Sequence, residues 1–156
     1  MIENVVTGYT VISDVALITL DKIPNDIRTV SEIFSSIAKH EINVDMIAQS
    51  PSYSGVVNIS FSIPSKDLSK AIATLAKFKK DIPQLRLDVD SNNTKVSVFG
   101  EGMRNIPGVA ANLFTILASN DIDIKLVTTS EIDISYLVSG KDEQKAIEAI
   151  TKEFKL

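Results

Sequence analysis

The sequence contains an internal duplication, which constrains the fold more strongly than any other feature of the chain. A shift of 80 residues places Phe34 on Phe114 and Ser50 on Ser130, and apolar residues between them also match. After residues 51–55, which have no counterpart, the shift becomes 75 and holds for the rest of the copy. A repeat of this length is too long for a solenoid unit and indicates a duplicated domain. The matched apolar pairs are Ala38 and Ala118, Ile42 and Ile122, Val44 and Ile124, Met46 and Leu126, and Ile47 and Val127.

The spacing of the apolar residues predicts the order strand, helix, strand, strand, helix in each copy. Alternating apolar and polar positions indicate strands with one buried face, and apolar residues at i, i+3, i+4 and i+7 indicate amphipathic helices. The first copy is predicted to form strands at 15–20, 42–46, 57–63 and 85–89 and helices at 30–38 and 68–76. The second copy is predicted to form strands at 96–98, 122–126 and 132–138 and helices at 110–117 and 146–154.

In this pattern the second copy lacks a fourth strand, and the unassigned segment over residues 3–9 can supply one. We therefore predict an α+β fold of two ferredoxin-like βαββαβ units, one over residues 12–90 and one over residues 91–156. The N-terminal strand completes the second unit, so the two units are interlocked. Ser91, Asn92 and Asn93 are expected to form a turn between the units, because Ser and Asn are frequent turn residues.

The composition excludes several functional classes. The 156 residues include no cysteine and one histidine, which excludes disulfides, thiolate metal sites, cysteine nucleophiles and multi-histidine metal sites. The net charge of −4 argues against nucleic acid as a partner, because phosphate contacts need concentrated positive charge. Residues 1–4 do not begin a signal peptide, and no run approaches the roughly 18 apolar residues that span a bilayer. We expect a cytoplasmic protein without membrane contacts, metal or cofactor.

Few residues are arranged for catalysis. Gly100 and Gly102 begin a dinucleotide-binding fingerprint, but Asn105 stands where the third glycine is required, and the sequence has no P-loop. His40 is placed at the end of a predicted helix, where the helix dipole favours a cation. No pair of carboxylates has a spacing that supports acid–base catalysis. The chain alone is therefore expected to have no phosphoryl-transfer activity.

The most informative segments are the two loops that precede the first helix of each copy, residues 22–28 and 102–108. Each loop delivers a helix N-terminus, whose unpaired N–H groups and positive dipole end favour a carboxylate. Gly108 would let a ligand approach the backbone closely, because glycine has no side chain. These loops are either binding sites for a carboxylate or ordinary helix caps.

Three segments, taken together, resemble one known family. They are residues 42–50 (INVDMIAQS), the loop from Gly102 to Ala110 (GMRNIPGVA), and residues 127–135 (VTTSEIDIS). In this order they are similar to the tandem ACT domains that form the regulatory region of aspartokinase, also called aspartate kinase. The resemblance covers essentially the whole chain, and the catalytic domain of that enzyme has no counterpart in it.

The resemblance implies a non-catalytic, allosteric regulatory module. Its two ACT units pair with those of a second chain, and a small amino acid, lysine or threonine, binds at the interfaces. Such binding provides feedback inhibition in aspartate-family amino-acid biosynthesis. The partner it implies, besides a second copy of the chain, is an aspartokinase catalytic domain or subunit.

The resemblance also implies two effector sites. The first comprises Asn25, Asp26, Ile27, Arg28 and Thr29, with Gln49 facing this loop and with Asp123 and Ile124 supplied by a partner chain. The second comprises Met103, Asn105, Gly108 and Val109, near Thr129 and Ser130. The family usually has Asp-Lys-Pro-Gly where this chain has residues 25–28, and asparagine where this chain has Asp123.

Three other functions fit parts of the pattern. A dimerisation module that binds no ligand is favoured by the altered residues of the first loop. An RNA-recognition fold shares the βαββαβ order but needs aromatic residues on neighbouring strands, whereas Phe61 and Tyr136 lie in different copies. An acylphosphatase-like enzyme would hold a phosphate with backbone amides and an arginine such as Arg104, but the sequence does not place an activated water or a catalytic partner asparagine.

Overall fold

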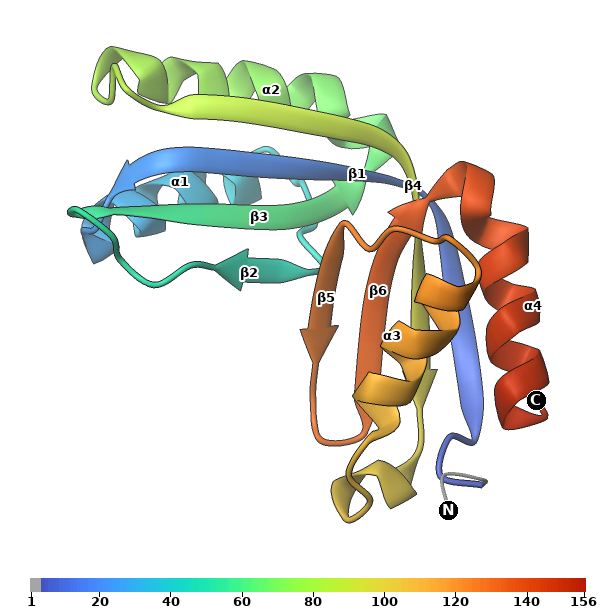
Figure 1. The fold of residues 1–156 in the computed structure, drawn as a ribbon. Helices are drawn as coiled ribbons and strands as arrows, with labels where there is room; N and C mark the ends of the chain where they lie inside the picture. The colour runs from blue at the N-terminus through green and yellow to red at the C-terminus, as the bar shows by residue number, and fades with distance from the viewer. Residues whose placement is uncertain (1–3) are drawn as a thin grey trace. The chain divides into compact units, whose positions relative to one another are not determined.

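The computed structural model describes residues 4–156 (Figure 1). Its strands are β1 (Gly8–Pro24), β2 (Ile47–Gln49), β3 (Val56–Pro64), β4 (Arg86–Phe99), β5 (Leu126–Thr129) and β6 (Asp133–Ser139). Its α-helices are α1 (Ile27–Lys39), α2 (Leu68–Ala76), α3 (Val109–Ser119) and α4 (Glu143–Phe154). Short 3-10 segments are η1 (Ser65–Asp67), η2 (Lys77–Lys80), η3 (Glu101–Arg104) and η4 (Gly140–Asp142).

The chain forms two compact units. The first unit is Asp14–Ser91, and the second combines residues 4–13 with Asn92–Leu156. The strands are hydrogen bonded in the order β2-β3-β1-β4-β6-β5, so β1 and β4 each contribute one part to each unit. Neighbours β1 and β3, β2 and β3, β4 and β6, and β5 and β6 pair antiparallel. The predicted α+β fold, with two ferredoxin-like units and an interlocked N-terminal strand, is confirmed.

Several predicted strand bounds were wrong. The strands expected at 42–46 and 122–126 lie further along the chain, as β2 and β5. Part of the strand expected over residues 3–9 lies outside the described residues, and within them the regular strand begins at Gly8 and continues to Pro24. Val5 and Val6 precede this strand, yet both are buried in the core of the second unit. Their apolar character therefore reflects core packing, which a local pattern cannot distinguish from strand formation.

The turn predicted at Ser91–Asn93 was also wrong, because these residues lie inside β4. Asn92 has a φ of 59°, and Asp14 in β1 has a φ of 56°. Asn and Asp tolerate this left-handed conformation better than other residues with side chains. A single left-handed residue can produce a bulge in a strand instead of reversing the chain. The same residue types therefore fit both a turn and a continuous strand.

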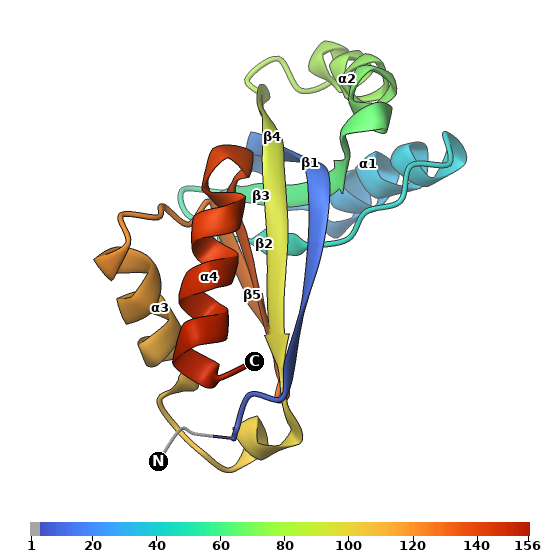
Figure 2. The same ribbon diagram turned by 90° about the vertical axis from the view of Figure 1, so that its right-hand side faces the viewer.

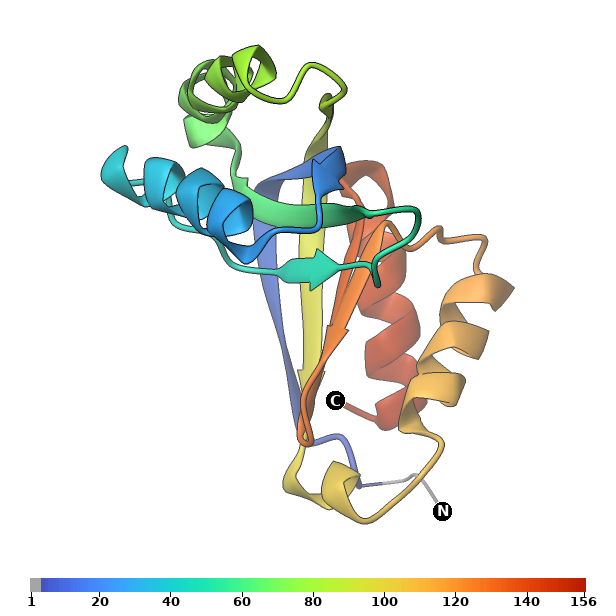
Figure 3. The same ribbon diagram turned by 90° about the vertical axis from the view of Figure 1, so that its left-hand side faces the viewer.

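The two units have matching cores. In the first unit, α1 and α2 pack against β1 and β3 (Figure 3), and the rings of Phe34 and Phe61 meet edge to face with centroids 5.4 Å apart. In the second unit, α3 and α4 lie side by side on one face of the strands (Figure 2). There Phe114 and Tyr136 form the corresponding edge-to-face pair, with centroids 5.6 Å apart. The duplication seen in the sequence is therefore also present in the packing.

Among residues 4–156, none of the helices is both long enough and apolar enough to cross a membrane.

Candidate functional site

The loop between β4 and α3 forms a tight, hydrogen-bonded turn before the helix begins. The N–H of Met103 donates to the carbonyl of Gly100 (3.1 Å), and the N–H of Asn105 donates to the carbonyl of Gly102 (3.3 Å). Gly108 is the N-cap of α3 and has a φ of 93°, a conformation that residues with a side chain rarely adopt. Since no side chain caps this helix, the N–H groups of its first turn remain available to an anion.

A cavity of 240 Å³ lies at this end of α3. It brings together Met103, Gly108, Val109, Thr129 and Ser130 of the predicted second site. Asn105 does not line it and is exposed on the loop. The cavity lining also includes four residues that the sequence reasoning missed: Ile106, Ala110, Glu131 and Ile134.

The polar wall of this cavity is the turn between β5 and β6. Thr129 ends β5 and is paired with Ile134 of β6. The N–H of Ser130 donates to the carbonyl of Asp133 (2.8 Å), and the Ser130 hydroxyl oxygen accepts from the N–H of Ile132 (3.3 Å). This turn therefore holds two hydroxyl groups and the carboxylate of Glu131 at the edge of the cavity.

Charged side chains meet beside the same cavity. Arg104 donates from Nε to Oε2 of Glu101 (3.2 Å) and from Nη1 to Oε2 of Glu131. Glu131 is a lining residue of the cavity, whereas Glu101 is not. Arg104 does not line the cavity either, so the carboxylate of Glu131 stands at the cavity edge and pairs with a guanidinium group just outside the lining.

The loop of the first unit has a different helix cap. Asp26 is the N-cap of α1, and its Oδ1 accepts from the backbone N–H of Arg28 (3.1 Å). Its Oδ2 accepts from the hydroxyl of Thr29 (3.3 Å). A carboxylate of the chain itself therefore occupies the N-terminus of α1, where an external anion would otherwise bind.

The remaining residues of the first predicted site lie around this helix end. The N–H of Asn25 donates to the carbonyl of Gly55 (3.0 Å), and Ile27 is 78% exposed. Arg28 is exposed, and within residues 4–156 it forms no ion pair with Asp26. Gln49, on β2, pairs with Ile59 of β3 and is exposed, at the edge of the core that contains Ile59.

Asp123 and Ile124 lie in the second unit. They line a surface hollow of 410 Å³ together with Phe114, Leu117, Ala118, Asp121 and Ile122. Phe114 is 44% exposed, which is high for an aromatic side chain that packs edge-on against a core residue. Asp123 is exposed and Ile124 is partly exposed, so a second molecule can reach both.

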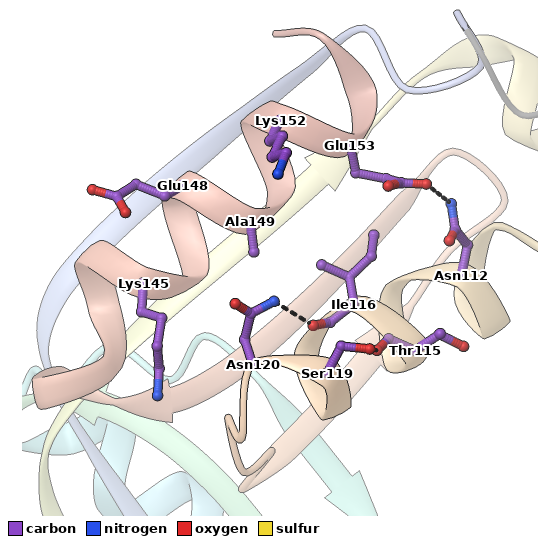
Figure 4. A pocket seen from close by; sticks show the side chains of 10 residues that line it. All are labelled: Asn112, Thr115, Ile116, Ser119, Asn120, Lys145, Glu148, Ala149, Lys152 and Glu153. Carbon is purple, nitrogen blue, oxygen red and sulfur yellow. Dashed lines mark hydrogen bonds between the residues drawn. The ribbon is translucent and has the colours of Figure 1, made fainter.

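A larger groove of 670 Å³ runs between α3 and α4 (Figure 4). Asn112 donates from Nδ2 to Oε1 of Glu153 (3.1 Å), which joins the two helices, and Asn120 donates to the carbonyl of Ile116 (2.8 Å). None of the residues predicted for effector binding lines this groove. Several of its polar groups already form hydrogen bonds or ion pairs within the chain, so it is a weaker candidate than the cavity at Gly108.

Tyr136 has a perturbed pKa although it lies outside these cavities. Burial raises the pKa of its phenol from 10.0 to about 12. The side chain is 1% exposed, and its hydroxyl has no hydrogen-bond partner among residues 4–156. The shift therefore reports desolvation in the core and does not indicate a catalytic group.

Comparison with known proteins gives a consistent picture. A family model described as ACT domain matches residues 22–77 and 96–154. An aspartokinase of Bacillus sp. (strain MGA3) is 38% identical over 97% of this chain, which spans 37% of the length of that relative. The regulatory subunit of aspartate kinase from Thermus thermophilus is 27% identical, with a TM-score of 0.87 over 96% of this chain and 99% of that one. A structure of aspartokinase alpha and beta subunits includes a chain that is 33% identical, with a TM-score of 0.88 over 97% and 99%.

Proposed function

The chain belongs to the ACT domain family and corresponds to the tandem-ACT regulatory region of aspartokinase. From this premise we propose that it senses lysine or threonine. Binding of the amino acid would regulate an aspartokinase catalytic domain or subunit and so provide feedback control of aspartate-family biosynthesis. The match does not cover the catalytic domain of the relatives, so the role of this chain is regulatory and not catalytic. The observation that carries the proposal is the cavity beside Gly108.

The chemistry of this cavity suits an amino-acid zwitterion. The uncapped N-terminus of α3 can receive the carboxylate, and Gly108 lets it approach the backbone. Glu131 offers a carboxylate for the ammonium group, and Met103 and Ile106 supply an apolar wall for the side chain. The volume of 240 Å³ is below the roughly 300–1,000 Å³ of drug-sized ligand sites and fits a small molecule.

We propose the first loop as the weaker effector site. Asp26 already occupies the N-terminus of α1, and Arg28 stands one residue inside the start of the helix. A ligand carboxylate would therefore have to displace a group of the chain, which the second site does not require. If this loop binds an amino acid, Asn25, Ile27, Thr29 and Gln49 would surround it.

The same proposal includes a homodimer formed through the ACT units. Strands β2 and β5 stand at the two ends of the strand order, so each has an unpaired edge. Natural proteins cover or pair such edges. The exposed hollow that contains Asp123 and Ile124 gives a second chain access to these residues, as the first effector site requires.

Isothermal titration calorimetry of the purified chain with individual amino acids tests the proposed function. We expect selective, saturable binding of lysine or threonine. Gly108→Ala should weaken binding at least ~10-fold, since it places a methyl group at the uncapped helix end and strains a φ of 93°. Gly55→Ala is the matched control, because Gly55 also has a positive φ (78°) but its added Cβ would meet open space.

The competing function, a dimerisation module without a ligand, is favoured by the way the side chain of Asp26 caps the N-terminus of α1. A dimer in which none of the amino acids binds, at concentrations up to millimolar, would refute the sensor function and support this alternative. Equal loss of binding in Gly108→Ala and Gly55→Ala would instead show that the ligand site is not at α3.

A further inference from the structure

Arg104 joins two segments that border the second-unit cavity. Its guanidinium contacts Glu101, at the start of η3, and Glu131, in the turn between β5 and β6. The two carboxylates, on Glu101 and Glu131, are 30 residues apart in the sequence, and Arg104 is the group that connects them. The loop before α3 and the β5–β6 turn are therefore held together by one ion pair, Arg104 with Glu131.

This ion pair belongs to the second unit alone. The shift of 80 residues places Arg104 on Pro24, and the shift of 75 that follows residues 51–55 places Glu131 on Val56; neither Pro24 nor Val56 carries a charge. The pair is thus not part of the shared core. It occurs in the unit whose helix N-terminus is uncapped and whose cavity is open to a ligand.

All three side chains are well exposed, at 47% for Arg104, 79% for Glu101 and 74% for Glu131. Ion pairs between exposed side chains are weak and are screened by salt. Such a pair can open without disturbing the fold. It is therefore suited to a contact that a ligand replaces.

We propose that the Arg104–Glu131 ion pair is a latch on the second-unit cavity and that an amino acid opens it by exchange. The ligand carboxylate takes the place of Glu131 on Arg104, beside the amides of α3. Glu131 is released and receives the ligand ammonium group, while Glu101 stays on Arg104 throughout. This mechanism rests on the proposed amino-acid site and makes Arg104 and Glu131 its specificity-determining residues.

The exchange gives opposite expectations for two kinds of probe. Glu131→Gln removes the competitor for Arg104, so butyrate, which has a carboxylate and no ammonium group, should bind ~3-fold more tightly. The same variant should bind lysine or threonine ~10-fold more weakly, because the ammonium group loses its charged partner. Arg104→Gln should weaken binding of both kinds of probe ~10-fold. NMR titration measures all of these affinities, including weak ones.

Glu101→Gln is the matched control. It removes the same charge from the same arginine, but Glu101 does not line the cavity. We expect it to change the affinity for either probe by less than ~2-fold. Equal effects of Glu101→Gln and Glu131→Gln would overturn the exchange mechanism even if the chain binds amino acids.

The latch can also be tested without a ligand. The chain has three arginines, Arg28, Arg86 and Arg104, so each Nε–H NMR signal can be assigned by an Arg→Lys substitution. In the free chain, Glu131→Gln should shift the Arg104 signal and leave the Arg28 signal in place. An unchanged Arg104 signal would overturn the latch. A shifted signal in a chain that binds no amino acid would refute the proposed function and the exchange, while confirming the ion pair.

Discussion

The hydroxyl of Tyr136 is expected to destabilise the protein, so Tyr136→Phe should stabilise it. The ring lies in the core of the second unit and packs edge-on against Phe114. The hydroxyl is buried without a hydrogen-bond partner among the described residues. At the equivalent position of the first unit, Phe61 makes the same aromatic contact without a hydroxyl. The substitution therefore removes an unsatisfied polar group and leaves the ring packing unchanged.

The expected gain at pH 7 is about 1–2 kcal/mol in the free energy of unfolding, the usual cost of burying an unpartnered hydroxyl. For a chain of this length, each kcal/mol corresponds to a rise of about 2–4 °C in Tm. Phe61→Tyr is the matched control, because it adds a hydroxyl at the corresponding position of the first unit. It should lower stability by at least a similar amount.

The same hydroxyl gives a pH dependence with a defined sign. The pKa of Tyr136 is about 12 in the folded chain and about 10 in the unfolded chain, so the unfolded state loses this proton first. The contribution is fully present below pH 10 and is lost as the pH rises toward 12. At pH 11 this effect lowers the free energy of unfolding of the wild type by about 1.4 kcal/mol. Tyr136→Phe has no phenol at this position, so its stability is not lowered in this way.

Urea denaturation followed by circular dichroism at pH 7 and pH 11 measures both effects. The stability difference between Tyr136→Phe and wild type should increase by about 1.4 kcal/mol between these pH values. Tyr53→Phe removes a hydroxyl from a side chain that is 82% exposed and should have no effect at either pH. A Tyr136→Phe variant that is less stable than wild type at pH 7 would refute the reasoning. So would an equal loss of stability at pH 11 in both proteins.

Two further predictions concern the first unit and assembly. Arg28→Gly should create or strengthen amino-acid binding at the first loop, because it removes a long side chain from the first turn of α1. Arg28→Lys, which keeps a long cationic side chain, is the control. Weaker binding in Arg28→Gly, measured by calorimetry, would contradict this prediction. Light scattering should show a dimer at micromolar concentration, since β2 and β5 have unpaired edges among the described residues. A monomer would count against a first effector site that is completed by the partner's Asp123.

The fold could be predicted from the sequence because the duplication supplied each element twice. A weak strand pattern in one copy could be checked against the other, and the interlocked N-terminal strand followed from the strand that the second copy lacks. The continuity of β1 and β4 could not be predicted. It depends on Asp14 and Asn92 adopting left-handed conformations within strands, and such residues occur in turns just as readily.

The candidate site could be predicted only where it depends on local sequence. Helix N-termini, Gly108 and the hydroxyls of Thr129 and Ser130 follow from the order of elements along the chain. The cap formed by Asp26 also had a local signal, because aspartate directly before a helical stripe is a preferred N-cap. The contact between Arg104 and Glu131 had none, since it depends on how a loop and a turn 27 residues apart are brought together by the fold.

The two units differ at the exposed ends of their helices and agree in their cores. The aromatic pairs Phe34 with Phe61 and Phe114 with Tyr136 keep the same place in both cores, because burial leaves little freedom there. The helix N-termini are exposed, and a change there costs little in packing. In the first unit Asp26 supplies the anion that the helix end favours, whereas in the second unit Gly108 leaves the N-terminus of α3 without a side-chain cap. Under the proposed function, a single difference in helix capping would be enough to give the two units effector sites of unequal affinity.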